Sequence, residues 1–551
     1  MQINILLCIQ LLQSCAFTAA FAPTRFTIPS PTSPAHAHAL YMAKGGADLS
    51  SISDKLNAAI QNCQPEFIKT CRVQVGPSPD GNRLGLIATE NMKKGDVAIN
   101  IPYDDQIVLS PALALKDVWK GVLPVKYDGW TGDNGLIALV LLNELAKTAT
   151  DGNAGIPKPI RKAAAASLIS AWIASLPSFN EMAKMHPIMW NEENQEILQS
   201  SSTKKIYRVL DDVDEDASWL DDNIWGLDRA KFPASVELNG ETYPCFSKEG
   251  FSWAISLISS RSVFVDGSSR LIPILDLANH DDLGVEEVQG GYMGTFGTTK
   301  GVLIRTGAGR KYEKGQEVFV SYGPKSAAEY LLDHGFVPKV ARSMRTSVAE
   351  LSFVLDQDDR FYDDKLDILE FETYESAPME PAQSFDVVSE VGSDIGPDPA
   401  MIQFLRLLKL NSKDAFLLES VFRNEVWGFM AVPVSEPNER DVLNAVAEAC
   451  TKALAGMEGI ESSADDDENS PASLCAVVRA SENKALTRTL EFVSREKEAL
   501  DLKEYYQERR LKDLGLDSQW TPDDRAAADP YGDEDEGLAF GQARVPGSLD
   551  W

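Results

Sequence analysis

The chain has 551 residues and a formal net charge of -31, and 44% of its residues are hydrophobic. This length leaves room for about two to four domains with ample core, and the acidic balance excludes a nucleic-acid binder that relies on phosphate contacts while favouring a basic protein partner. The seven cysteines are scattered without a Cys-x-x-Cys pair, which excludes a zinc framework and a disulfide scaffold and fits a reducing compartment.

Residues 1–45 predict a targeting presequence. Residues 1–23 have an apolar core followed by small residues, as in a secretory signal peptide, although the positively charged start is missing. They are too short to predict a membrane span. Residues 24–43 are rich in Ser, Thr, Pro and His without an acid, as transit peptides are. The tetrapeptide Ala-Phe-Ala-Pro at 20–23 resembles the cleavage motif of bipartite plastid presequences, so we expect a plastid protein; the alternative is a secretory one.

The following part of the chain mixes strand and helix patterns. Short apolar runs bounded by turn residues predict strands at 73–75, 84–88, 97–102, 302–304 and 317–322. Apolar positions at helical spacing, with Pro177 as a stop, predict helices at 136–145, 168–176 and 251–259. The strands thus fall into two groups separated by helices, and both groups must meet in space for a core to close.

After about residue 345 the pattern changes. Residues 351–397 are acidic and mixed, and helical segments are then predicted at 401–405, 414–429 and 441–454. Ser470 as a cap and Pro471 as the first residue predict the start of a long final helix. The acidic tail, residues 516–551, is expected to be disordered.

Three polar residues, Asp276, Asn279 and His280, end an apolar stretch. Buried polar groups must be hydrogen-bonded or meet a ligand. A metal site would need more ligands than this pattern supplies. A hydrolase triad of Ser260, His280 and Asp276 lacks the flanking Gly-x-Ser-x-Gly signature. On the pattern alone, the simplest interpretation is a helix end with an Asn-His cap.

Tyr322 shares a strand face with Val318 and Val320, which predicts a core aromatic. Gly323 and Pro324 follow at once and end the strand, so the phenol is expected at a rim, where it can donate or accept a hydrogen bond.

Three sets of motifs, taken in order, resemble those of SET-domain protein methyltransferases. They comprise Arg83 to Ala88 with 94–96 and 101–102; Ser260 to Phe264 with 271–273, Asp276 and Asn279-His280; and Gly315 to Gly323 with Glu329 to Phe336. The helical insert with Trp172 to Pro177 and the helical C-terminal region are similar to those of the Rubisco large-subunit methyltransferase group. The resemblance covers about residues 66–515, and the ordered set is specific although each motif alone is weak.

The resemblance implies S-adenosylmethionine-dependent methyl transfer to a protein lysine or, in one branch of the family, a histidine. Tyr322 would be the catalytic phenol. The residues implied to hold the cofactor are Asn82, Arg83, Leu84, Arg261, Asn279 and His280. Those implied on the substrate side are Arg261, Asp276, Tyr322 and His334. Asn279 and His280 would lie in the loop under which the end of the domain threads to form the SET pseudoknot.

The expected architecture is α+β. A β-rich SET domain with a pseudoknot would occupy 46–345, with a helical insert at about 113–250, followed by an all-helical substrate-binding domain at 346–515. We expect a monomer that binds a lysine-bearing protein segment, without metal or nucleic acid, and that is not embedded in a membrane when mature. Methyl transfer needs alignment and a neutral amine, and it does not require a metal.

Three positions depart from the family pattern. Arg83 stands where glycine is usual, Ala327 where asparagine is common, and His334 where tyrosine is frequent. These departures bear on the substrate more than on the cofactor. The expected function is protein-lysine methylation in a plastid, with the Rubisco large subunit or another stromal enzyme as the target. The alternatives are an inactive SET scaffold that binds a protein partner, a protein-histidine methyltransferase and, more distantly, a secreted hydrolase.

Overall fold

The computed structural model describes most of the chain between residues 49 and 513. The described ranges are 49–78, 83–124, 127, 129–156, 161–198, 202–281, 288–293, 299–306, 311–371, 378–393, 396–457 and 467–513. The predicted presequence, Asn82 and the predicted disordered tail lie outside these ranges. None of the helices in the described parts combines the length and apolar character needed to span a bilayer.

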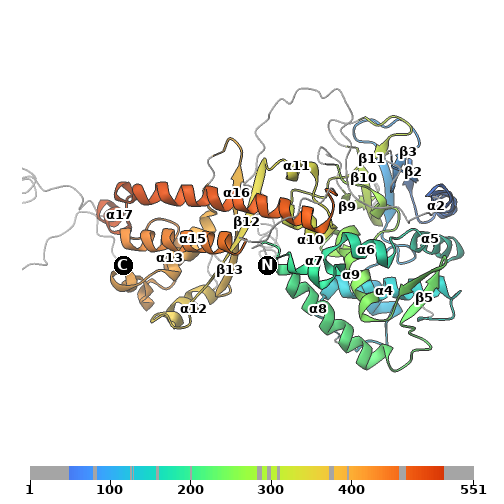
Figure 1. Cartoon of the computed structure of the whole chain (residues 1–551), viewed down its shortest axis with the longest axis horizontal. Helices are drawn as coiled ribbons and strands as arrows, with labels where there is room; N and C mark the ends of the chain where they lie inside the picture. Colours follow the sequence, from blue (N-terminus) through green and yellow to red (C-terminus); the bar gives the residue numbers. More distant parts are fainter. Residues whose placement is uncertain are drawn as a thin grey trace, which may run out of the picture. The chain divides into compact units, whose positions relative to one another are not determined.

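Two small antiparallel sheets form the β-rich part of the structure (Figure 1). One has the strand order β1-β4-β10-β9 and the other β11-β3-β2. The strands are β1 (Thr70–Cys71), β2 (Val73–Pro77), β3 (Leu84–Ala88), β4 (Val97–Pro102), β9 (Val288–Met293), β10 (Thr299–Arg305) and β11 (Glu317–Val318). β10 pairs with β4, and β11 pairs with β3. The two groups of strands therefore meet across the helical insert, as the sequence predicts.

Helices dominate the segment between these groups of strands. They are α3 (Pro111–Leu113), η1 (Ala114–Val118), α4 (Gly132–Ala149), α5 (Ala163–Ile173), α6 (Phe179–Met185), η2 (Pro187–Met189), α7 (Glu192–Glu196), α8 (Lys205–Leu220), η3 (Asp221–Trp225) and α9 (Lys248–Arg261), preceded by α2 (Leu49–Cys63) before the first strand. The insert also contains a hairpin that the sequence analysis missed, β5 (Ser235–Leu238) with β6 (Glu241–Pro244).

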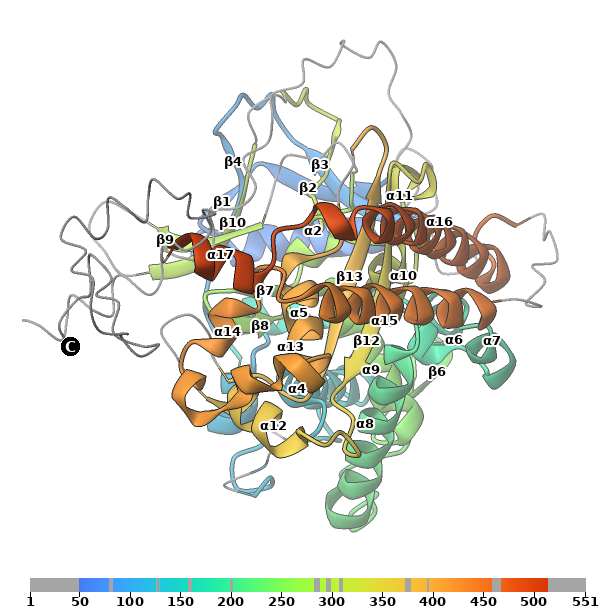
Figure 2. The ribbon, with the colours of Figure 1, turned by 90° about the vertical axis from the view of Figure 1, so that its left-hand side faces the viewer.

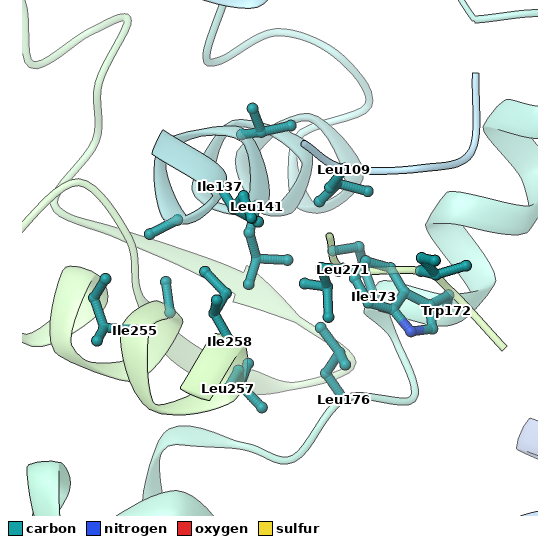
Figure 3. Close-up of a cluster of buried hydrophobic side chains, with 14 of the residues drawn as sticks. Leu109, Ile137, Leu141, Trp172, Ile173, Leu176, Ile255, Leu257, Ile258 and Leu271 are labelled. Atoms are coloured by element: carbon teal, nitrogen blue, oxygen red, sulfur yellow. The ribbon is translucent and has the colours of Figure 1, made fainter. Parts of the chain in front are cut away.

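The core of the insert is built on α4, in which every residue from Gly135 to Ala146 is buried. Helices that are apolar all round belong in the middle of a core. Figure 3 shows Ile137 and Leu141 of α4 facing Ile255 and Ile258 of α9, with Leu109 and Leu271 beside them. This packing fixes the C-terminal end of α9, where the candidate site begins.

The chain leaves α9 through a short hairpin and a tight turn. The hairpin is β7 (Val263–Val265) with β8 (Ser268–Arg270), and the turn is η4 (Leu275–Leu277). Leu271 is tied back to Leu109 by two backbone hydrogen bonds of 2.9 and 3.0 Å. The predicted helix end at Asp276 to His280 is thus only a single 3-10 turn followed by extended chain.

The segment 317–322 was predicted as one strand, but only β11 is regular. Val320 forms an isolated parallel bridge with His280 instead of extending the ladder with β3. The chain leaves β3 because it crosses the segment 279–281 at this point. It then enters α10 (Ala327–His334) and α11 (Lys339–Arg342).

The C-terminal region, 346–513, corrects the all-helical prediction. It opens with the strand β12 (Thr346–Val354), which is followed by α12 (Tyr362–Glu370) and then by β13 (Ala382–Glu390), the antiparallel partner of β12. β12 alternates buried and exposed residues, which is the strand period, but its Ser and Glu residues weaken the apolar signal. The remaining elements are α13 (Pro399–Leu408), η5 (Ser412–Leu418), η6 (Ser420–Phe422), α14 (Val426–Phe429), α15 (Glu436–Ala455), α16 (Pro471–Glu498), η7 (Leu500–Leu502) and α17 (Tyr506–Asp513). The single helix predicted over 414–429 is therefore two 3-10 turns and one α-turn.

α16 begins at the predicted cap, where Ser470 Oγ accepts a hydrogen bond from the backbone N–H of Ser473 at 3.2 Å. Figures 1 and 2 show α16 lying alongside α15. Its first half packs Leu474 and Val478 into the core of the β-rich part and its insert, and its second half packs Leu486 and Val493 into a separate C-terminal core. One helix thus belongs to both cores.

Candidate active site

Two distant segments cross at the centre of the site. The backbone N–H of Val320 donates to the carbonyl of Asn279 at 2.9 Å, and the N–H of Asp281 donates to the carbonyl of Val320 at 3.1 Å. The segment after β11 is therefore pinned against the loop 279–281, as expected for the crossing of a pseudoknot.

The side chain of Asn279 ties all three motifs together. Its Nδ2 donates to the carbonyl of Leu84 at 3.0 Å and to Glu317 Oε1 at 2.6 Å. The other carboxylate oxygen of Glu317 accepts from the Ser78 hydroxyl at 2.9 Å. A Cβ on Gly85 would lie 2.2 Å from Glu317 Oε1, so only glycine lets the carboxylate approach the strand.

Sequence reasoning missed Glu317 and Ser78. Both side chains are buried, at 5% and 3% exposure. The available signal was a carboxylate inside an apolar strand run, since a buried charge requires dedicated partners. That signal was hidden because an acid at alternate strand positions normally points to solvent.

His280 links the loop 279–281 to the Tyr322 segment through hydrogen bonds of its ring. Its Nδ1 accepts the backbone N–H of Tyr322 at 3.1 Å, which places the ring proton on Nε2, 3.4 Å from the hydroxyl oxygen of Tyr330. The Tyr330 hydroxyl in turn donates to the carbonyl of Gly323 at 2.7 Å. The imidazole is thereby committed to holding the Tyr322 segment in place.

The structure does not assemble the hydrolase triad considered above. The Ser260 hydroxyl is buried and bonds to the carbonyls of Ser256 and Leu257, at 3.0 and 3.2 Å, inside α9. Asp276 pairs with Arg261 rather than with His280. In addition, no three His, Cys, Asp or Glu side chains gather as a potential metal site within the described ranges.

Tyr322 lies in the wall of a cavity of about 420 Å³. The cavity is lined by residues 259–265, from the end of α9 through β7, by residues around η4, and by Val320 to Gly323, Lys325 and His334. The Tyr322 hydroxyl donates to the carbonyl of Ala278 at 2.9 Å, which fixes the phenol and leaves its oxygen lone pairs as acceptors. The phenol thus stands at the predicted rim.

Arg261 and Asp276 form a buried ion pair beside this cavity. Arg261 Nη1 lies 3.0 Å from Asp276 Oδ2 and also bonds the Asp276 carbonyl at 3.2 Å. Trp172 of α5 donates its indole N–H to the same carboxylate, at 3.0 and 3.1 Å from its two oxygens. Burial raises the pKa of Asp276, while Arg261 and Trp172 act in the opposite direction. The carboxyl group is occupied by these partners, which suits it to positioning Arg261.

His334 closes the cavity from α10. Its ring lies 4.7 Å from that of Tyr322, centroid to centroid, and its Nδ1 lies 3.2 Å from the carbonyl oxygen of Ser260. α10 itself is fixed at its start by a reciprocal cap of Ser326 and Glu329, and at its end by Gly335 in the left-handed conformation (φ 75°).

Of the residues predicted to hold the cofactor, Leu84 and Asn279 meet at the crossing through the hydrogen bond described above, and Arg261 lies beside the cavity. Arg83 is 3% exposed and precedes β3, Leu84 is half-buried as its first residue, and His280 is buried next to Asn279 in the chain. Because the side chains of Asn279 and His280 are engaged with protein groups, their main-chain groups are what a bound molecule could use. Arg261 contributes the cation and Tyr322 the acceptor oxygen, a donor set that fits an amino-acid carboxylate and a sulfonium methyl group.

A second cavity, of about 630 Å³, adjoins the first one. The two share Ser321, Gly323 and Lys325. The second is also lined by α10, by residues 338–341 and by the β12–β13 hairpin, including Glu329 and Asp386. It therefore brings the C-terminal region next to the Tyr322 segment.

Comparison with known proteins covers most of the chain. The family model described as Rubisco LSMT substrate-binding matches residues 356–500. The tobacco (Nicotiana tabacum) chloroplastic ribulose-1,5-bisphosphate carboxylase/oxygenase large subunit N-methyltransferase is 30% identical over 471 residues, which is 82% of this chain and 84% of the tobacco protein. The Arabidopsis thaliana chloroplastic [fructose-bisphosphate aldolase]-lysine N-methyltransferase is 35% identical over 277 residues, 49% of this chain and 55% of that protein.

Solved structures show the same relationship. The SET domain of LSMT bound to lysine and AdoHcy superposes with a TM-score of 0.66 at 26% identity, covering 85% of this chain and 97% of that chain. Rubisco LSMT bound to AdoMet superposes with a TM-score of 0.63 at 25% identity, covering 84% of this chain and 97% of that chain. Both the β-rich part and the C-terminal region have their counterparts in these structures.

Proposed function

This chain belongs to the Rubisco large-subunit methyltransferase family of SET-domain proteins and is therefore an S-adenosylmethionine-dependent protein-lysine N-methyltransferase. We propose that its substrate is a lysine of a plastid protein and that the methyl group is transferred beside the Tyr322 hydroxyl. The family assignment rests on 30% identity over 84% of the tobacco enzyme. The observation that carries the site is the Tyr322 phenol, held by Ala278 and His280 in the wall of the 420 Å³ cavity.

The reaction is a displacement in which an amine nitrogen takes a methyl group from sulfur. The cofactor supplies that methyl group on a sulfonium centre. The nitrogen–carbon bond forms as the carbon–sulfur bond breaks, the electron pair of the broken bond goes to sulfur, and the product is an N-methylammonium with one proton left to lose. The attacking amine must be neutral, and removal from water lowers the pKa of a lysine.

In this mechanism Tyr322 orients the attacking amine and the methyl group, and it neither gives up nor takes up a proton. Its hydroxyl proton is committed to Ala278, so its oxygen is available as an acceptor for an amine N–H or a polarised methyl C–H. A fixed dipole of this kind stabilises charge that develops during transfer and aligns the nucleophile.

The cofactor would be held where the three motifs meet. We assign Arg261 to its carboxylate, because Asp276, itself fixed by the Trp172 indole, holds the guanidinium at the cavity wall. The main-chain groups of Leu84, Asn279 and His280 would hold the remainder, together with Arg83 and Asn82. Asp276 then acts through Arg261 as a positioning residue, although it was first expected to contact the substrate.

The protein substrate would dock across residues 346–515, with residues 46–345 as the SET domain. Three observations support this. The family model for substrate binding covers residues 356–500, the second cavity joins the hairpin β12–β13 to the Tyr322 segment, and the net charge of -31 attracts a basic surface. The relatives act on the Rubisco large subunit and on aldolase, so a stromal enzyme of this type is the proposed target.

The function is tested by incubating the purified protein and labelled S-adenosylmethionine with a plastid extract from cells that lack this protein, so that its target lysines are unmethylated. We expect one or few labelled proteins and, by mass spectrometry, methyl groups on lysine. Label on histidine would move the chain to the other branch of the family. A protein that binds the cofactor but labels nothing would instead be a scaffold.

A further inference from the structure

Phe264 lies at the mouth of the reaction cavity and has no part in the transfer step. Its side chain lines the cavity of about 420 Å³ and is nevertheless 75% exposed. Val320 and Leu275 line the same cavity and are each 2% exposed, as expected for its interior. A side chain that belongs to the cavity and also meets solvent must lie at its opening.

Exposed apolar side chains are common on protein surfaces, and a single one needs no explanation. Phe264 differs in its place and in its degree of exposure. Among the aromatic side chains in the described parts of the chain it is the most exposed, followed by Trp130 at 58%. Trp130 lines neither the reaction cavity nor the cavity beside it, so only Phe264 combines high exposure with a place at the site.

The hairpin that carries Phe264 is braced against movement. Its two-residue turn, Asp266 and Gly267, has positive φ angles of 51° and 74°, the backbone geometry that closes a tight hairpin. The hydroxyl of Tyr103, directly after β4, donates to Asp266 Oδ2 at 2.7 Å, and Cζ of Arg270 lies 4.1 Å from the centroid of the Tyr103 ring. The backbone of the hairpin therefore holds the Phe264 ring at the mouth.

The alternation along β7 directs the ring outward. Val265, the next residue, is 8% exposed and packs into the core, so the strand period places Phe264 on the opposite face. An aromatic ring on a fixed backbone loses little conformational freedom when a partner covers it. Aromatic side chains also contribute strongly to the binding energy of protein interfaces. Phe264 thus has the properties of a recognition residue.

We propose that Phe264 packs on an apolar side chain next to the target lysine in the protein substrate and thereby makes the enzyme select lysines with such a neighbour. The inference rests on the proposed function and adds a feature of the substrate sequence to it. Phe264 is then a specificity-determining residue that touches the substrate outside the site of transfer.

The occupant of the mouth follows from the reaction. The segment that carries a lysine to the Tyr322 hydroxyl must pass the opening where Phe264 lies. An extended segment advances about 3.3 to 3.6 Å per residue, so only residues one or two positions from the lysine stay near the mouth. Burying the ring under an apolar side chain is favourable, whereas a polar neighbour would lose water there without gaining a hydrogen bond from the ring.

The first test reads the substrate sequence. Mass spectrometry of the stromal protein that the wild type labels identifies the methylated lysine. We expect an apolar residue one or two positions away from it. A methylated lysine whose neighbours at those positions are all glycine or polar would overturn the proposal.

The second test changes enzyme and substrate together in a double-mutant cycle. The substrate is the same stromal protein, with the apolar neighbour of the lysine either kept or replaced by glycine. We expect this replacement to lower kcat/KM about tenfold with the wild type and less than about twofold with Phe264→Ala. Most of the wild-type loss should lie in KM, because Phe264 contacts neither the amine nor the methyl group. Equal losses with both enzymes would overturn the proposal.

Two further variants control for unspecific effects. Leu227→Ala removes an apolar side chain that is also 75% exposed but lines neither cavity, so it should discriminate between the two substrates as the wild type does. Phe264→Leu keeps an apolar side chain at the mouth and should keep most of the discrimination. Loss of the discrimination in either variant would contradict the assignment to an apolar contact at Phe264.

Fluorine NMR tests the contact without any turnover. 4-Fluorophenylalanine is incorporated at position 264, and S-adenosylhomocysteine is present throughout. We expect the fluorine signal to move with a synthetic peptide that has leucine on both sides of a lysine, and to stay with a peptide that has glycine there. The same response to both peptides, or no response to either, would overturn the proposal. A wild type that methylates no protein would defeat the proposed function, but these titrations would still decide on Phe264, so the two failures are distinguishable.

Discussion

Gly85 shows how a single position controls the site. The strand β3 must let the buried Glu317 carboxylate reach Asn279 and Ser78, and a side chain at Gly85 would fill that space. The crossing of the SET motifs thus depends on a residue that makes no polar side-chain contact of its own.

Gly85→Ala is expected to lower the free energy of unfolding by about 1 to 3 kcal/mol, because overpacking displaces Glu317 from its partners. It should also weaken S-adenosylmethionine binding, measured by calorimetry. Gly456→Ala is the control, because a Cβ there meets only ordinary contacts at 3.5 Å and should leave both quantities nearly unchanged.

Trp172→Phe removes the indole N–H that bonds Asp276 and keeps most of the ring packing. A hydrogen bond to a charged group is worth about 1.5 to 3 kcal/mol, so we expect a loss of stability of this order and a raised KM for S-adenosylmethionine through a displaced Arg261. Trp253→Phe breaks a similar buried bond to the carbonyl of Pro177 and should cost stability without changing KM. Equal KM effects in both variants would argue against the positioning role of Asp276.

At this scale the sequence predicted some residues and not others. Tyr322 was accessible because strand alternation and the following Gly323 place a phenol at a rim. Glu317 could not be predicted, because an acidic residue in a strand is normally expected to face solvent. Its two partners lie 38 and 239 residues away in the chain. The indole bond that occupies Asp276 likewise joins residues 104 positions apart.

Among the elements, α10 connects the cavity wall to the insert, because two neutral histidines form hydrogen bonds at its C-terminal end. His334 bonds the carbonyl of Ser260, and His186 of the insert donates to the carbonyl of Asp333 at 3.2 Å. Burial lowers the pKa of each histidine to about 4. The folded state therefore resists protonation of both rings.

The free energy of unfolding should decrease as the pH is lowered from about 6.5 to about 4. Above about pH 6.5 both histidines are neutral in the folded and unfolded states; below it the unfolded chain takes up protons that the folded state refuses until about pH 4. We expect protonation of each histidine in the unfolded state to lower the free energy of unfolding by about 2 kcal/mol at pH 5. Denaturant unfolding at pH 7 and pH 5 measures this, and His186→Gln should flatten the dependence. An unchanged slope in that variant would refute the assignment.

The elements themselves were predicted unevenly. α16 was readable because Ser470 and Pro471 form a start signal and apolar residues recur at helical spacing. The hairpin β12–β13 was missed because its two strands are separated by α12 and its exposed face is polar, so neither strand stands out alone. Segment 414–429 has apolar residues side by side, and tertiary packing rather than helical period decides its 3-10 turns.

On the scale of the whole molecule, α16 links the two cores. A sequence boundary near residue 345 separates the SET part from the C-terminal region in chain order, but Leu474 and Val478 of the later region complete the first core. We therefore expect the described region to unfold as one cooperative unit.

Leu474→Ala tests this coupling. Leu474 is 2% exposed, and truncating a buried leucine costs about 2 to 5 kcal/mol. The loss should appear both in the unfolding of the C-terminal region and in S-adenosylmethionine binding by the SET part. Leu502→Ala makes the same chemical change at a residue that is 82% exposed and should be neutral. Two separate unfolding transitions in Leu474→Ala, one unchanged from wild type, would contradict the shared core.

The central claim, that Tyr322 directs methyl transfer to a lysine, is tested most directly by Tyr322→Phe. Single-turnover transfer from labelled S-adenosylmethionine to the stromal substrate should slow by about 10² or more, because one fixed dipole is lost where charge develops. Cofactor affinity by calorimetry should change by much less than the rate, because Tyr322 offers the cofactor only a weak contact to its methyl C–H and the other proposed cofactor contacts lie at other residues. A variant that transfers the methyl group at the wild-type rate would contradict the account.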